Sequence, residues 1–168
     1  FPEFFTDTDK QFFDFFQKSK GFNAIFSGSY VRDTVLYSGA AQGPIHGNAL
    51  RMNVKLAPPL GFRNTKGHTS FSWDYRRYKR ISDGSLLAFR FAGLQSSRPS
   101  GEYVLLGGDS TLRAYPYGFI AGNQAVYGSV EVRFPFVDAV VFPGRFGIGP
   151  FRGFLFADYA LSRFSGGN

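Results

Sequence analysis

Large apolar side chains alternate with small or polar side chains along most of the chain. The pattern covers residues 22–37, 50–56, 70–75 and 86–94. A period of two residues is typical of a β-strand whose two faces differ chemically. The sequence Ser82-Asp83-Gly84-Ser85, which precedes the last of these segments, favours a tight turn and therefore predicts a β-hairpin.

Two further alternating segments, residues 125–137 and 151–164, follow a Gly- and Ser-rich stretch at residues 95–124. This stretch is longer than an ordinary hairpin loop and carries several aromatic residues, so we expect it to pack against the rest of the domain. The chain predicts about six strands of roughly ten to fifteen residues. That length exceeds the usual strand of a globular protein and matches tilted strands that cross a bilayer.

We therefore expect an all-β fold, an antiparallel transmembrane β-barrel over residues 22–168, with apolar side chains toward lipid and small or polar ones toward the lumen. A soluble β-sandwich is the alternative. The smallest bacterial barrels have about eight strands, and an open sheet in lipid leaves backbone groups unpaired. We therefore expect a partial barrel, completed by strands from the same or another chain.

Residues 1–21 predict a short helical segment or linker before the first strand. Thr6 to Asp9 are typical of a helix N-cap, and the Phe residues at 12, 13, 15 and 16 form an apolar face. Such a helix either packs on the domain or serves as an interfacial segment or a connection to an upstream domain.

The composition excludes several kinds of site. The chain has no Cys, which rules out disulfides, Cys-based zinc sites and thiol nucleophiles. His46 and His68 lack a metal-binding spacing, so we predict no metal site and expect both in loops. Neither a GxSxG nor a GxxxxGKS/T motif occurs, and the sequence predicts no enzyme and no cofactor. No run of about 18 apolar residues occurs, which excludes a transmembrane helix.

A net charge of +7 favours an anionic neighbour. The basic residues Arg76, Arg77, Lys79 and Arg80 precede the predicted turn, where we expect them at a membrane rim near phosphate headgroups. A soluble nucleic-acid-binding domain that stacks bases on Tyr75 and Tyr78 is the alternative. The alternating aromatic faces favour the membrane, so we predict no nucleic-acid partner.

Three motifs follow one another in residues 107–160. The long loop carries Gly107, Gly108, Leu112, Arg113 and Tyr115, followed by Gly122 and Asn123; the next strand carries Ser129, Glu131, Arg133 and Pro135; the last strand carries Phe156 and Asp158. In this order the motifs resemble the C-terminal barrel of the BamA/TamA outer-membrane assembly superfamily, also called the bacterial surface antigen family. Ala114 and Ala160 replace the family's glycines after the loop arginine and after the strand aspartate.

The resemblance implies that the long loop folds into the barrel and that Arg113 contacts Glu131 and Asp158 on the inner wall. A guanidinium fork is suited to bridging two carboxylates. The resemblance also implies a bacterial outer-membrane protein that acts in membrane protein insertion or polypeptide translocation. Its implied partners are outer-membrane lipid and lipopolysaccharide, unfolded outer-membrane or secreted polypeptides, and accessory lipoproteins. Alternatively, the barrel anchors a larger protein whose upstream soluble domain carries the activity.

Overall fold

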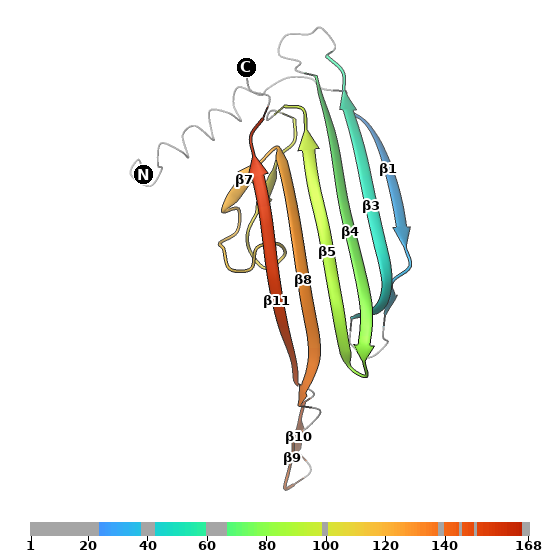
Figure 1. Cartoon of the computed structure of the whole chain (residues 1–168), viewed down its shortest axis with the longest axis vertical. Coiled ribbons are helices and arrows are strands. Elements are labelled where there is room, and N and C mark those ends of the chain that lie inside the picture. Colours follow the sequence, from blue (N-terminus) through green and yellow to red (C-terminus); the bar gives the residue numbers. More distant parts are fainter. Residues whose placement is uncertain are drawn as a thin grey trace, which may run out of the picture.

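A computed structural model describes residues 24–37, 43–59, 67–98, 101–137, 140–144, 146–149 and 151–165. These residues form an all-β fold dominated by one antiparallel sheet with the strand order β1-β3-β4-β5-β8-β11 (Figure 1). The strands are β1 (Phe26–Asp33), β3 (Pro44–Ala57), β4 (His68–Ser82), β5 (Ser85–Ser96), β8 (Gln124–Val137) and β11 (Phe151–Arg163), and β2 (Leu36–Tyr37) pairs with β3. Each long strand pairs with the next long strand along the chain, so the sheet is a meander.

The long strands lie where the alternation predicts them, and the boundaries differ. The first predicted strand is interrupted between Asp33 and Leu36, where Thr34 lies close to Gly47 of β3. A Cβ at Gly47 would lie 2.2 Å from the carbonyl oxygen of Thr34, so glycine permits this close approach. The expectation that His46 and His68 lie in loops is wrong, since they lie in β3 and β4. Both strands extend beyond their clearly alternating parts.

The two faces of the sheet differ in chemistry, as the alternation predicts. Residues paired across neighbouring strands share a face. The face that contacts the loop between β5 and β8 is called the inner face, and the opposite one the outer face. The inner face includes Ser29, Arg51, Asn53, Lys55, Ser70, Ser72, Asp74, Arg76, Arg90, Ser129, Glu131, Arg133 and Asp158. The outer face includes Phe26, Tyr30, Leu50, Met52, Val54, Phe71, Trp73, Phe89, Phe91, Val126, Val130, Val132, Leu155, Tyr159 and Leu161.

The stretch between β5 and β8 folds against the inner face, in agreement with the expectation that it packs. It contains a two-stranded sheet of β6 (Val104–Leu106) and β7 (Ile120–Gly122). Leu106 and Leu112 pack with Ala125 and Tyr127 of β8 in a buried cluster. A separate hairpin of β9 (Val140–Phe142) and β10 (Phe146–Ile148) extends beyond the end of the sheet (Figure 1).

The sheet is open among the described residues, with β1 and β11 as its edges, and these strands do not close into a barrel. The helix predicted for residues 1–21, and the boundary that follows it, lie outside the described residues. The described part of the chain contains no helix long and apolar enough to span a membrane.

Candidate functional site

Two glycines of the loop motif give the loop its shape. Gly107 and Gly108 have φ values of +133° and +81°, which L side chains rarely adopt. The backbone N–H of Gly107 donates to Thr111 Oγ1 at 2.7 Å, and that hydroxyl donates to the carbonyl of Gly107 at 3.1 Å. The N–H of Gly108 donates to the carbonyl of Tyr115 at 2.9 Å. These bonds close a compact turn that contains Arg113.

Replacing Gly107 with Ala is expected to destabilise this turn. A Cβ at Gly107 would lie 2.1 Å from the carbonyl oxygen of Pro116, so the backbone must shift in addition to bearing the φ strain. We expect a loss of about 1 to 3 kcal/mol in the free energy of unfolding. Gly118→Ala is the matched control, because its φ is +71° but its nearest neighbouring atom is 3.8 Å from the Cβ position. Equal effects of the two substitutions in chemical denaturation would contradict this prediction.

Arg113 forms a two-pronged contact with Asp158 of β11. Its Nε and Nη2 donate to the two carboxylate oxygens of Asp158, each at 2.9 Å. The backbone N–H of Arg113 also donates to Asp158 Oδ2 at 3.3 Å. This fork geometry fixes both the distance and the direction of the guanidinium, which a lysine ammonium does not achieve.

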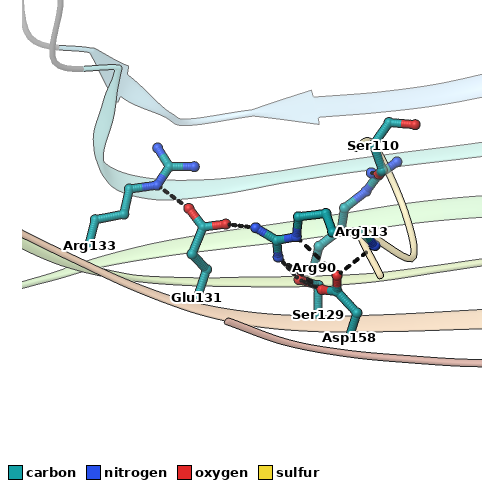
Figure 2. A network of polar contacts seen from close by, with 7 residues as sticks. All are labelled: Arg90, Ser110, Arg113, Ser129, Glu131, Arg133 and Asp158. Atoms are coloured by element: carbon teal, nitrogen blue, oxygen red, sulfur yellow. Dashed lines mark hydrogen bonds and ion pairs between the residues drawn. The ribbon is translucent and has the colours of Figure 1, made fainter. Parts of the chain in front are cut away.

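The same guanidinium reaches β8. Arg113 Nη1 donates to Glu131, and its Nη2 donates to Ser129 Oγ at 3.1 Å. Ser129 in turn donates to Asp158 at 2.7 Å, and Arg133 Nε donates to the other oxygen of Glu131. Figure 2 shows Arg113 between Glu131 on one side and Ser129 and Asp158 on the other. The guanidinium therefore joins the loop to two neighbouring strands of the sheet.

The cluster is shielded from solvent. The side chains of Arg113, Glu131 and Asp158 are 18%, 14% and 6% exposed. Phe156 lies beneath the guanidinium, with Arg113 Cζ 3.7 Å from the ring centroid, a favourable cation–π arrangement. The hydrogen bonds to Asp158 raise the pKa of the Arg113 guanidinium, partial burial opposes the rise, and the bond to Glu131 adds to it. Arg113 therefore stays charged.

A second contact joins the loop to the inner face. Arg90 of β5 donates through Nη1 to the backbone carbonyl of Ser110 at 2.7 Å (Figure 2). Its Nε and Nη2 donate to Asp74 of β4 at 3.3 and 2.9 Å, and its Cζ lies 5.4 Å from the Tyr127 ring centroid. Arg76 donates to the same Asp74 carboxylate at 3.1 and 2.8 Å. Arg90 is thus positioned by contacts within the sheet and also binds the loop.

A third contact lies nearer the start of the loop. Glu102 accepts hydrogen bonds from Lys55 of β3 and, at 2.6 Å, from Ser70 of β4. Burial raises the pKa of Glu102, but the Lys55 and Ser70 hydrogen bonds outweigh that effect and hold the pKa below its usual value. The stabilisation is therefore present at neutral pH and is lost as the pH falls through the pKa of the folded protein.

Asn123 ties the end of the loop to the sheet. Its side chain is fully buried, with Nδ2 donating to the carbonyls of Ser96 and Ser165 at 3.0 and 2.7 Å. The backbone N–H of Ser165 donates back to Asn123 Oδ1 at 2.7 Å. This residue joins the ends of β5 and β11, which are not neighbours in the sheet.

The remaining motif residues have distinct positions. Leu112 is buried in the apolar cluster, whereas Tyr115 is half exposed and stacks on Phe119 with ring centroids 4.8 Å apart. Pro135 lies next to Gly84 of the β4–β5 turn. The sequence did not indicate that Arg90 and Lys55 contact the loop, that Glu102 contacts the sheet, or that Asp74 holds Arg90. Opposite charges at the alternating inner positions of β4 and β5 are the signal that would have indicated the Asp74–Arg90 pair.

The described residues contain no group of His, Cys, Asp or Glu side chains that is arranged to hold a metal ion. Comparisons with known proteins found no matching family model, no similar curated protein and no similar solved structure. The resemblance to a known family therefore rests on the loop and strand motifs of the sequence.

Proposed function

We propose that this chain forms part of a transmembrane β-barrel of the bacterial outer membrane, of the surface antigen type. We further propose that the barrel acts in membrane protein insertion or polypeptide translocation. It performs no covalent chemistry. Its work is mechanical: the loop held by Arg113 keeps one side of the wall in a fixed shape, while a weaker seam elsewhere admits polypeptide.

The observation that carries this proposal is the contact of a loop arginine with carboxylates on two successive strands. Arg113, Glu131 and Asp158 each belong to one of the three motifs. Arg113 in the loop and Asp158 in β11 are 45 residues apart in the sequence. The motifs are features of the sequence, and the contact between their residues in the fold supports the proposal.

The outer face supports membrane residence. On β8, the outward side chains over residues 126–136 are apolar except for Gly128, and such a run has about the 9 to 11 residues that a tilted strand needs to cross a bilayer. Phe26, Tyr30, Tyr159 and Leu161 are each more than half exposed. In water these side chains would form a large apolar patch, which soluble monomers rarely expose.

The open edges are consistent with the same proposal. Unpaired backbone groups in lipid cost several kcal/mol each, so β1 and β11 require partner strands there. We propose that further strands of the same or another chain pair with these edges and complete the barrel.

Membrane residence is directly testable. We expect the intact protein to sediment with the outer membrane, to resist extraction by carbonate or urea, and to require detergent for solubility, because its apolar face needs lipid. Density-gradient fractionation followed by extraction measures this. Quantitative recovery as a soluble monomer without detergent would overturn the proposed location.

The proposed activity is tested by depletion. Cells that lose the protein should accumulate unfolded outer-membrane or secreted polypeptides. Wild-type protein should restore normal folding or secretion of these polypeptides, whereas an Arg113→Ala variant should restore it poorly. Pulse-chase measurement of barrel folding gives the readout. Normal assembly and secretion after depletion would contradict the activity and leave the barrel as a membrane anchor.

A further inference from the structure

The outer face carries a groove whose lining is mostly outward residues and also includes Arg90, Ser129 and Asp158, whose side chains take part in the loop contacts. It has a volume of about 830 Å³ and crosses β4, β5, β8 and β11. Its lining includes Gly128, which has no side chain, and Ala157, whose side chain is a single methyl group; we call these two residues its floor, and Phe89, Phe91 and Val130 its walls. The three wall residues are between 38% and 49% exposed, so the groove is an open apolar surface.

Two cations lie at the β4 end of this groove. Arg77 and Lys79 line it and are exposed. No hydrogen bond or ion pair joins either of them to another residue in the described part of the chain. Their neighbours Arg76 and Arg80 belong to the inner face and form ion pairs with Asp74 and Asp83. Within this basic segment, the outward cations are thus the unneutralised ones.

We infer that this groove binds an anionic glycerophospholipid, with an acyl chain along the apolar floor and the phosphate between Arg77 and Lys79. Residues two apart on one strand lie about 7 Å apart, a spacing that lets both cations contact a single phosphodiester. From β4 to β11 the groove is roughly 14 Å wide, given about 4.8 Å between neighbouring strands. These dimensions suit a lipid with few acyl chains and one phosphate better than lipid A.

Charge complementarity is the main argument for this occupant. Charged and apolar surfaces meet at one place, which matches an amphiphile and not a polar solute. Arginine and lysine at the edge of an apolar band attract anionic headgroups and keep their charge in the interfacial region. The inference rests on the proposed membrane location and extends it from general contact with lipid to one specific site.

Two variants test the headgroup contacts and the acyl-chain contacts separately. The double variant R77Q/K79Q removes the cations from exposed positions. Gly128→Leu fills the groove instead, and no atom lies within 4 Å of the Cβ position of Gly128, so a larger side chain enters open space. Gly28→Leu is the matched control, because Gly28 lies on the outer face of β1, outside the groove, and also has no atom within 4 Å. Arg32→Gln is the control for loss of an outward cation elsewhere.

The intact protein in detergent is titrated with phosphatidylglycerol, phosphatidylcholine and lipid A, and bound lipid is counted by native mass spectrometry. We expect phosphatidylglycerol to bind most tightly, R77Q/K79Q and Gly128→Leu each to weaken its binding about tenfold or more, and both controls to retain it. Preference for lipid A, equal binding of phosphatidylcholine, or unchanged binding by the groove variants would overturn the inference. The same proteins are also fractionated with membranes. A protein that fractionates with the membrane but does not bind phosphatidylglycerol contradicts the lipid site alone, whereas a protein that does not fractionate with the membrane contradicts the proposed location.

Discussion

Replacing Arg113 with Ala is expected to release the loop from the sheet and to leave Glu131 and Asp158 without their shared counter-charge. Breaking a buried ion pair from one side costs roughly 3 to 5 kcal/mol. The substitution also removes the contact with the Phe156 ring. The loop should become accessible to protease and the free energy of unfolding should fall by about that amount. Arg113→Lys should restore part of it, because an ammonium lacks the fork.

Two further variants show whether the loss of this counter-charge is the cause. Arg51→Ala removes another inner-face arginine that makes no hydrogen bond or ion pair with a residue in the described ranges, and it should have little effect. Adding Asp158→Asn to Arg113→Ala removes the carboxylate that has lost its cation and should recover part of the stability, whereas Glu131 keeps its ion pair with Arg133. Protease cleavage of the loop at the wild-type rate in Arg113→Ala would contradict the role assigned to this contact.

The antiparallel sheet was largely predictable because its signal is local. Alternation with a period of two residues is set by backbone geometry, so Val130 and Val132 on one face and Glu131 on the other follow from the sequence. The Asp83-Gly84 turn was predictable for the same reason, and Gly84 has a φ of +83°. The early start of β3 at Pro44 was not, because its first residues pair with β2, and that pairing depends on the path of the chain and not on alternation.

The contacts of the candidate site were likewise predictable only in part. The charges of Asp74 and Arg90 are visible in the sequence, but their meeting depends on the register between β4 and β5, and the contact with Ser110 depends on the path of the loop. Arg113 was placed near Glu131 and Asp158 by resemblance to a family, and spacing alone would have left each as a solvated charge. In the structure these three side chains are in contact.

Asn123→Ala is expected to destabilise the protein strongly, although the residue carries no charge. Its fully buried side chain holds the backbone of Ser96 and Ser165 through three hydrogen bonds. Truncation leaves the buried Ser96 carbonyl and the part-buried carbonyl and N–H of Ser165 without this partner, and an unsatisfied buried polar group costs about 1 to 3 kcal/mol. A total loss of roughly 2 to 5 kcal/mol follows, since water can replace part of the lost bonding.

The effect of Asn123→Ala should appear where the chain ends of β5 and β11 meet. Amide hydrogen exchange at Ser165 should accelerate more than exchange in the middle of β8, because Ser165 N–H loses its acceptor while the strand ladder remains. Asn53→Ala is the control, since Asn53 is part-buried and makes a single 3.4 Å hydrogen bond to Ser72. Asn123→Asp is a second probe: its carboxylate can still accept from Ser165 but cannot donate to either carbonyl, so it should be at least as destabilising as Ala. If Asn123→Ala and Asn53→Ala lower the free energy of unfolding equally, the join between β5 and β11 does not depend on Asn123.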